Sequence, residues 1–440
     1  MKRNLYKKLL DWKSKKNRMP LILIGARQVG KTYLINMFGK NEYNDIHIFN
    51  FQEKPSLHNI FKKDFDPKRI LDELSISQRK DINIKSDFVF FDEVQECDQA
   101  ITSLKYFNEV LPELHISAAG SLLGIKYNSS SFPVGKVEIY YLYPMNFHEF
   151  LMASSDKISN NLYNEINRLE SAHNLLWDYA RQYFYVGGMP KAVESWFSNK
   201  GINQKIETVR KIQNDILLGY EKDFAKHSGK INAIQIGRLF NNIPVQLSNV
   251  YDASAKRFKF KGAIPGKKNY LQLADTISWL ENAGLIYKVF IVDSRPQIPL
   301  KSLIKRNKFK LFLFDIGMLG AMLELSYNDI FNQNYGTTKG FFAENYVACE
   351  LKACGYKSLY SWTQSKSEIE FLVVDNQSNI IPVEVKSGLR TKSKSLKSYI
   401  ERYEPEKTIK LVGKAGGTNP VNIVLPLYYA GNIFQITTMP

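Results

Sequence analysis

The segment Gly25–Thr32 constrains this chain more than any other, because it matches the phosphate-binding pattern G-x-x-x-x-G-K-[ST] in full. An apolar run, Leu21–Gly25, precedes the loop, and a helical pattern follows from Tyr33. In that context the glycines let backbone N–H groups turn inward around a phosphate, and the helix N-terminus favours the negative charge. Lys31 is expected to reach the β- and γ-phosphate oxygens, and the Thr32 hydroxyl to ligate Mg²⁺. The predicted nucleotide-binding residues are Gly25, Ala26, Arg27, Gln28, Val29, Gly30, Lys31, Thr32 and Tyr33.

A second motif, Phe88–Glu93, joins four apolar residues to two adjacent acids. Asp92 is placed to hold the metal through water, and Glu93 to polarise the attacking water. The alternative, two acids that cap a strand in a surface turn, is weakened by the complete phosphate-binding motif. ATP and Mg²⁺ are therefore the predicted cofactors, with Thr32 and Asp92 as candidate metal ligands. Lys31 and Glu93 are candidate catalytic residues.

Ser121 is a third candidate catalytic residue, because it follows the apolar run His115–Ala119. A polar side chain at that place can contact the γ-phosphate, whereas a plain Gly-Ser turn is the alternative interpretation. An arginine-finger role is not assigned to any residue. The only candidates are Arg27, Lys136 and Arg181.

The first third of the chain alternates short apolar runs with helical patterns, which predicts a parallel α/β sheet. The expected strands are Leu21–Gly25, Ile46–Phe51, Asp87–Asp92, His115–Ala119 and Val137–Leu142. The additional run Ile46–Phe51 between the two motifs, together with the acid Glu93, points to the glutamate-using hydrolytic branch of P-loop proteins.

Helical patterns then fill residues 162–195 and are broken at Gly187–Pro190. Residues 234–293 run helix, basic loop, helix and strand, an order that suits a winged helix. The last third, from Ser326, predicts a helix at Gly340–Cys354 and three strands. These are expected at Lys357–Trp362, Glu368–Val374 and Ile380–Val385.

Several motifs in order resemble a family of prokaryotic AAA-type ATPases that carry a C-terminal domain of unknown function. They are the phosphate loop, Phe90–Glu93, Gly120-Ser121, Tyr143–Phe150, Gly187–Pro190, Lys310–Leu319, Gly340–Asn345 and Pro382–Gly388. The resemblance covers nearly the whole chain. It implies a P-loop NTPase parallel α/β sheet with a helical lid, then a winged-helix segment and a restriction-endonuclease-like α/β domain.

The corresponding domain boundaries are 1–158 for the ATPase core, 159–200 for the lid, 201–325 for the winged-helix middle and 326–440 for the nuclease-like part. One departure is Gly135-Lys136, where the family has Gly-Arg. A lysine supplies a point charge without the bidentate fork of an arginine, which puts the local role of that position in doubt.

Four residues of the last third resemble the PD-(D/E)xK nuclease core. Glu384 and Lys386 should share one face of a strand, with Glu370 on an earlier strand and Glu344 on the preceding helix. In such a core two carboxylates hold Mg²⁺ and the lysine positions water. Glu370 stands where the usual residue is Asp. The alternative is an ordinary solvated ion pair worth under about 1 kcal/mol, so that the fold is nuclease-like but does not cleave.

The chain has 60 Lys and Arg against 43 Asp and Glu, a net charge of +17. Much of the excess lies at the N-terminus and in three clusters, at residues 256–268, 301–310 and 390–397. Three clusters near a winged-helix pattern and a nuclease-like core favour contact with nucleic acid, and each run taken singly is equally well a solvated loop. The basic N-terminal segment alternates with Leu5, Leu9 and Trp12. It is expected to form an amphipathic helix that packs on the ATPase, or less favourably on an anionic membrane.

These patterns predict a cytoplasmic, Mg²⁺-dependent ATPase that works on DNA. Three cysteines are too few for a disulfide framework, and the longest apolar runs are too short for a transmembrane segment. The alternative is a nucleotide-switched protein-interaction module whose nuclease-like fold is inactive. A protein partner and a homo-oligomer both remain open.

Overall fold

The computed structural model describes residues 1–121, 123, 132–166, 170–228, 230–248, 257–336, 338–388, 393–418 and 421–438. The chain forms two compact units. The N-terminal unit comprises Lys2–Tyr143 and Asn282–Gly284, and the C-terminal unit comprises Pro144–Glu281 and Leu285–Pro440. The boundaries expected near residues 158, 200 and 325 all lie inside the C-terminal unit, and this finer subdivision stays a prediction.

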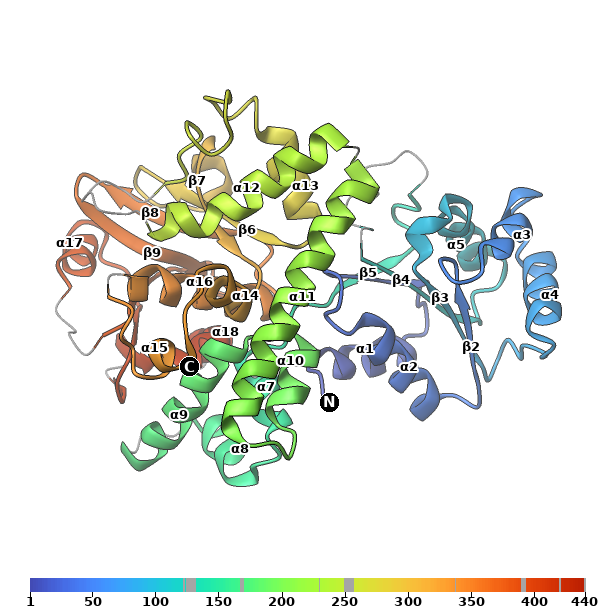
Figure 1. The fold of residues 1–440 in the computed structure, drawn as a ribbon, viewed down its shortest axis with the longest axis horizontal. Helices are drawn as coiled ribbons and strands as arrows, with labels where there is room; N and C mark the ends of the chain where they lie inside the picture. Colours follow the sequence, from blue (N-terminus) through green and yellow to red (C-terminus); the bar gives the residue numbers. More distant parts are fainter. Residues whose placement is uncertain are drawn as a thin grey trace. The chain divides into compact units, whose positions relative to one another are not determined.

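The N-terminal unit contains a five-stranded parallel sheet in the order β2-β3-β4-β1-β5 (Figure 1). All five predicted strands are confirmed, at β1 (Leu21–Ile24), β2 (Ile46–Asn50), β3 (Phe88–Asp92), β4 (His115–Gly120) and β5 (Glu138–Tyr141). In space β4, not β2, lies between the strands that carry the two motifs. Every residue of β1 and β3 is buried, as expected for strands covered on both faces.

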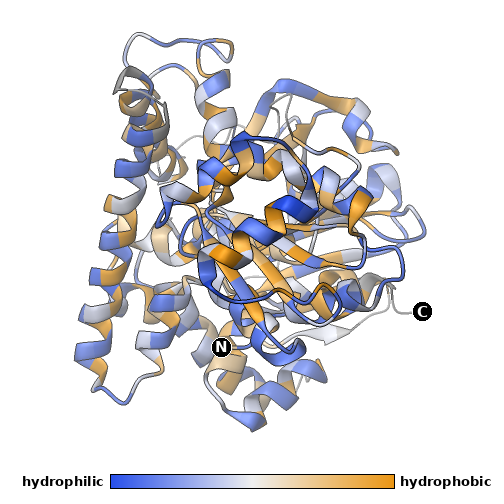
Figure 2. Cartoon of the chain, turned by 90° about the vertical axis from the view of Figure 1, so that its right-hand side faces the viewer, coloured by the Kyte–Doolittle hydropathy of each residue, from blue (hydrophilic) through white to orange (hydrophobic). Residues whose placement is uncertain are grey.

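The helices of this unit cover the sheet. They are α1 (Leu5–Ser14), α2 (Lys31–Glu42), α3 (His58–Lys62), α4 (Pro67–Gln78) and α5 (Asp98–Val110). Leu9 and Trp12 of α1 are fully buried, and the Trp12 ring lies 6.2 Å from that of Phe88. The prediction that the N-terminal helix packs on the P-loop domain is thus confirmed. Figure 2 shows the strands mostly in hydrophobic colours, with helices of mixed character around them.

The C-terminal unit contains an eight-stranded mixed sheet in the order β12-β13-β11-β10-β9-β8-β6-β7. Its strands are β6 (Ile286–Val292), β7 (Ile304–Leu313), β8 (Leu359–Gln364), β9 (Ser367–Val374), β10 (Ile380–Lys386), β11 (Thr408–Val412), β12 (Gly417–Thr418) and β13 (Asn422–Pro426). The β6–β7 hairpin joins the later strands because β6 pairs in parallel with β8. This places β7 at one edge of the sheet.

Twelve helices belong mainly to this unit within the described ranges. They are α7 (Phe147–Ala153), α8 (Lys157–Asn164), α9 (Glu170–Val186), α10 (Pro190–Trp196), α11 (Ile202–Ser228), α12 (Lys230–Ser248), α13 (Ala274–Asn282), α14 (Ile316–Met322), α15 (Tyr327–Phe331), α16 (Thr338–Ala353), α17 (Lys394–Tyr403) and α18 (Ile433–Thr438). The interruption predicted at Gly187–Pro190 is confirmed between α9 and α10. Helix α16 packs on β7, β8 and β10, and α17 packs on β9. In the part of the chain that the structure describes, no helix is both long and apolar enough to cross a membrane.

Two buried carboxylates hold helix starts together inside this unit. Asp315 accepts hydrogen bonds from the backbone nitrogens of Gly188 (2.6 Å) and Met318 (2.9 Å), and burial raises its pKa to about 6. Glu350 accepts a 2.8 Å bond from the backbone nitrogen of Phe147, the first residue of α7. Burial raises the pKa of Glu350 to about 8, and the charge of Glu149 adds to the effect. Glu350 therefore favours its protonated form in the folded chain near neutral pH.

We predict that Glu350→Gln stabilises the protein at alkaline pH. The folded pKa of Glu350 lies above its usual value of 4.5, so its contribution to stability is lost as pH rises toward about 8. The slope is about 1.4 kcal/mol per pH unit, and glutamine keeps an acceptor for Phe147 without the charge. Urea unfolding between pH 4.5 and about 8 should show a smaller decrease in the free energy of unfolding for the variant than for the wild type. Glu401→Gln, at an exposed position of α17, is the matched control, and parallel profiles for wild type and Glu350→Gln would contradict the assignment.

Candidate functional site

The phosphate-binding loop joins β1 to α2. Gly30 precedes the first residue of α2 and has a φ of 93°, a left-handed conformation that favours glycine. At Gly25 a Cβ atom would collide with the carbonyl of Leu142, so the chain after β5 passes too close for a side chain. The loop therefore has the glycines at the positions where backbone geometry requires them.

Lys31 begins α2 and folds back into the loop. Its side chain is buried, and its Nζ donates to the carbonyls of Gly25 and Ala26, both at 2.9 Å. Burial lowers the pKa of Lys31 to about 8, although the charges of Glu93 and Asp92 act in the opposite direction. An anion in the loop would stabilise the protonated ammonium.

The two predicted metal ligands lie side by side. The Thr32 hydroxyl donates to both carboxylate oxygens of Asp92 at 3.1 Å, and the Asn50 amide lies 3.4 Å from one of them. Burial raises the pKa of Asp92 to about 6, and the neighbouring Glu93 adds to the increase. A hydroxyl and a carboxylate are hard oxygen donors of the kind that Mg²⁺ prefers, so the residues fit this ion. Asn50, at the end of β2, was not a sequence candidate.

Glu93 follows β3 in a left-handed conformation, with a φ of 48°. The Gln95 amide donates a 2.6 Å hydrogen bond to the Glu93 carboxylate. A Cβ atom at Gly120 would collide with the amide oxygen of Gln95, so Gln95 extends from Glu93 to the end of β4. Ser121 follows there and is buried. Gln95 thus connects the predicted base to the end of the strand that precedes the predicted sensor, which sequence spacing did not reveal.

Arg3 is a further residue of the site that the sequence analysis missed. It is buried, and its guanidinium donates to the carbonyl of Val29 at 2.7 Å and to that of Tyr143 at 2.5 Å. These bonds tie the phosphate loop to the chain that follows β5. In the sequence Arg3 looks like one more residue of the basic N-terminal run, because only the folded chain brings it to the loop.

The remaining candidate residues have varied surroundings. Arg27 is exposed, and Tyr33 is 55% exposed. Lys136 pairs with Glu109 at 3.0 Å. Arg181 belongs to the C-terminal unit, where it donates to the Phe331 carbonyl at 3.1 Å and stacks on that ring at 4.1 Å.

The N-terminal unit is a P-loop NTPase domain in which one strand, β4, separates the phosphate-loop strand from the acidic strand. A family model described as an AAA domain matches residues 17–151, so this unit is similar to AAA domains and has the fold of a P-loop ATPase. Two models described as domains of unknown function, DUF8612 and DUF4143, match residues 178–329 and 339–428. No curated protein matches the chain.

Solved structures with some likeness include the Walker-type ATPase PabY2304 of Pyrococcus abyssi, at 13% identity and a TM-score of 0.44. That match covers 73% of this chain and 95% of the other. The AMPPCP-bound DnaA of Aquifex aeolicus has 16% identity and a TM-score of 0.27, over 63% of this chain and 86% of its own.

The four residues predicted to resemble a nuclease core do come together in the C-terminal unit. Lys386 lies 3.2 Å from Glu384, which confirms that the two share a strand face. Glu370 accepts a 3.0 Å hydrogen bond from the backbone nitrogen of Val385, and burial followed by the charge of Glu344 raises the pKa of Glu370 to about 7. Among the described residues, however, no group of three or more His, Cys, Asp or Glu side chains is arranged to hold a metal ion.

One assignment to the basic surface is wrong. Lys310 was counted with the exposed cluster 301–310, but it is only 4% exposed. It pairs with Glu344 at 3.1 Å and with Glu368. The second half of β7 is buried from Phe309 onward, so Lys310 belongs to the interior.

The other members of the basic clusters that the structure describes lie on neighbouring segments. Loop 257–270 packs on β7, because the Phe258 nitrogen donates to the Phe309 carbonyl at 2.8 Å and the two rings stack. Leu300, beside exposed Lys301, shares a hydrophobic cluster with Leu396 of α17. Lys256, Arg390 and Lys392 lie outside the described residues.

We predict that ATP affinity falls as pH rises above about 8, the pKa of Lys31. The phosphates stabilise the charged ammonium, so above this pH the lysine must take up a proton when ATP binds. The affinity for ATP should therefore fall by up to about tenfold for each pH unit. The last ionisation of a phosphate group has a pKa of about 6, so it is complete before the pH reaches this range. Calorimetry in two buffers of different ionisation enthalpy should detect the proton. An affinity that stays constant well above this pKa would contradict the prediction.

Proposed function

We propose that this chain binds ATP with Mg²⁺ and hydrolyses it, and that it uses the nucleotide cycle to act on DNA. One observation carries the ATPase part: Lys31, Thr32, Asp92 and Glu93 meet at the carboxyl ends of β1 and β3. Ligands bind at this edge in parallel α/β sheets. Lys31 would neutralise the β- and γ-phosphates, and Glu93, held by Gln95, would take the proton of the attacking water.

Thr32 and Asp92 are the residues that would hold Mg²⁺. The ion supplies charge neutralisation for the phosphates when it is bound. The Thr32–Asp92 hydrogen bond keeps both oxygens at the mouth of the loop. Ser121, close to the Gln95 bridge, is the residue proposed to sense the γ-phosphate.

DNA contact is proposed for the basic surface along the β6–β7 hairpin. Lys301 and Arg306 are exposed, and so are Arg257, Lys259 and Lys261 of the loop that bonds to β7 through Phe258. Lys305 and Lys308 both pair with Asp293, at 2.9 Å and 2.6 Å, so their charge is partly neutralised. Contacts of this kind go to phosphates and give affinity without sequence preference.

The chain itself supports a connection between the two activities. Asn282–Gly284 belongs to the N-terminal unit, while the rest of α13, up to Glu281, and the strand β6 belong to the other unit. A Cβ atom at Gly284 would lie 3.4 Å from the backbone nitrogen of Ala26 in the phosphate loop. We therefore propose that nucleotide binding at the loop is transmitted through this turn to the β6–β7 hairpin.

The finer domain assignments remain part of this proposal. Helices α12 and α13 followed by the β6–β7 hairpin support a winged helix within 201–325. The order α16, β8, β9, β10, α17, β11 supports a nuclease-like fold within 326–440. A helical lid is proposed for 159–200. The alternative, a nucleotide-switched protein-interaction module, is favoured by Lys310, which already pairs with Glu344 of the nuclease-like core.

Replacing Glu93 tests the hydrolytic role directly. We predict that Glu93→Gln lowers ATP turnover by about 10²- to 10⁴-fold, because the amide cannot accept the proton of water. ATP affinity should change little, since no phosphate contact is removed. Turnover and fluorescent-nucleotide binding are measured together, with the exposed Glu113→Gln as control. Near-normal turnover in Glu93→Gln would rule out this residue as the base.

DNA binding is tested over a salt series, from about 50 to 200 mM, with a labelled duplex. The double variant Lys301→Ala/Arg306→Ala should reduce the slope of log affinity against log salt by about 0.9 for each lost phosphate contact. Lys62→Ala/Lys63→Ala, on the N-terminal unit, is the matched control. DNA should also stimulate ATP turnover in the wild type. A complete lack of binding at the lowest salt would favour the protein-interaction alternative.

A further inference from the structure

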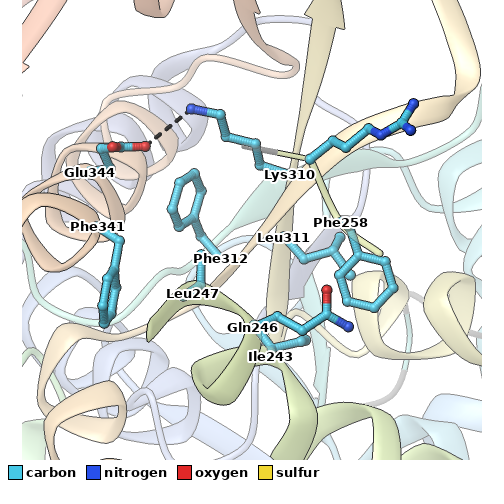
Figure 3. Close-up of a pocket in the computed structure, with 10 residues that line it drawn as sticks. Ile243, Gln246, Leu247, Phe258, Lys310, Leu311, Phe312, Phe341 and Glu344 are labelled. Atoms are coloured by element: carbon cyan, nitrogen blue, oxygen red, sulfur yellow. Dashed lines mark hydrogen bonds and ion pairs between the residues drawn. The ribbon is translucent and has the colours of Figure 1, made fainter. Parts of the chain in front are cut away.

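A buried lysine sits among the acids of the C-terminal unit. Lys310 comes from β7, and its ammonium lies 3.1 Å from Glu344 of α16 and also pairs with Glu368 of β9. Both Lys310 and Glu344 are almost fully buried, at 4% and 3% exposure. Figure 3 shows the ammonium directed at the Glu344 carboxylate, with the stem of the side chain beside Phe312.

The surrounding charges are nearly balanced without any added ion. Glu344, Glu368, Glu370 and Glu384 face three lysines. The other two lysines pair with Glu384, which has no exposed surface. The Nζ atom of Lys386 lies 3.2 Å and that of Lys410 lies 3.8 Å from the Glu384 carboxylate. Burial alone would lower the pKa of Lys310, but the charges of Glu344 and Glu368 outweigh it and raise the pKa above its usual value. The position of its ammonium, within ion-pair distance of both Glu344 and Glu368, makes Lys310 the counter-charge of these two acids.

We propose that Lys310 is the resident cation of this carboxylate cluster, occupying the place between Glu344 and Glu368 where a divalent ion would otherwise bind. The C-terminal unit then operates without a bound metal, and its acids stabilise the fold and do not cleave nucleic acid. This inference is independent of the proposed ATP hydrolysis, which takes place in the other unit.

Geometry and charge both exclude joint occupancy. A divalent ion needs several oxygens at about 2.0 to 2.6 Å, and an ammonium already bonded to the same carboxylates would repel it. Lys310 and Glu344 also line a pocket together with the apolar side chains of Leu311, Phe312 and Phe341, so few other polar groups are there to bind an ion.

Removal of the lysine should uncover a metal site. The test uses the full chain in an Asp92→Asn background without nucleotide, so that the phosphate loop contributes little metal binding. Mn²⁺ binding is counted by electron paramagnetic resonance, and the melting temperature is followed with and without Mn²⁺. We expect no Mn²⁺ at the cluster with Lys310 present, and one bound ion with a raised melting temperature in Lys310→Met. Glu344→Gln added to Lys310→Met should abolish that ion.

Lys308→Met is the matched control, because Lys308 is on the same strand but pairs with Asp293 outside the cluster. It should gain no Mn²⁺. The proposal is overturned if folded Lys310→Met gains no ion, or if the background protein binds one that Glu370→Gln removes. Metal-dependent nicking of plasmid by the wild type, lost in Glu370→Gln, would also overturn it.

If Lys310→Met fails to fold, the double variant Lys310→Met/Glu344→Gln decides the question through stability. It removes both charges of the pair, so recovery of a cooperative thermal transition supports the role of Lys310 as counter-charge. A double variant as unstable as the single one would show that neutralisation is not what Lys310 provides, and would overturn the proposal.

Discussion

Burial of the four-residue strand β1 between β4 and β5 positions the nucleotide site. The strand is hydrogen-bonded on both sides and has no exposed residue, so the position of its carboxyl end is fixed by the neighbouring strands. The loop that follows is confined by the Leu142 carbonyl beside Gly25 and by Arg3, which bonds to the loop at Val29. Lys31 and Thr32 are then placed by the first turn of α2. The chemistry of the site follows from this one confined strand and its connections.

The C-terminal unit depends on a different constraint, the neutralisation of buried acids. Glu350 and Asp315 are held by backbone N–H groups, and burial raises the pKa of each. Glu344 is held instead by a full counter-charge, Lys310. A backbone donor suits an acid that can protonate, whereas a lysine suits a cluster in which several carboxylates lie close together. The two arrangements explain why this unit can contain so many acids in its interior.

Local sequence patterns predicted most of the structural features that are determined by residues close together in the sequence. The phosphate loop follows from a local motif, while the five strands of the first sheet and the shared strand face of Glu384 and Lys386 follow from short-range periodicity. Contacts between distant segments were missed, because Arg3, Asn50 and Gln95 carry no local signal of their role. Lys310 was misplaced for the same reason: its neighbours Lys305 and Lys308 lie in the solvated half of β7, and the strand becomes buried only afterwards.

Some of the motifs that resemble a known family have a structural role and do not supply residues for ligand binding or reaction. Gly187 and Asp315 come from two motifs far apart in sequence, yet a Cβ atom at Gly187 would collide with the Asp315 carboxylate. The same carboxylate accepts from Gly188 and from Met318 at the start of α14. The glycine gives the close approach, and the acid satisfies backbone groups that would otherwise be buried without partners. Both motifs therefore encode one contact that holds α9, α10 and α14 together, while the residues proposed to bind and hydrolyse ATP lie in the other unit.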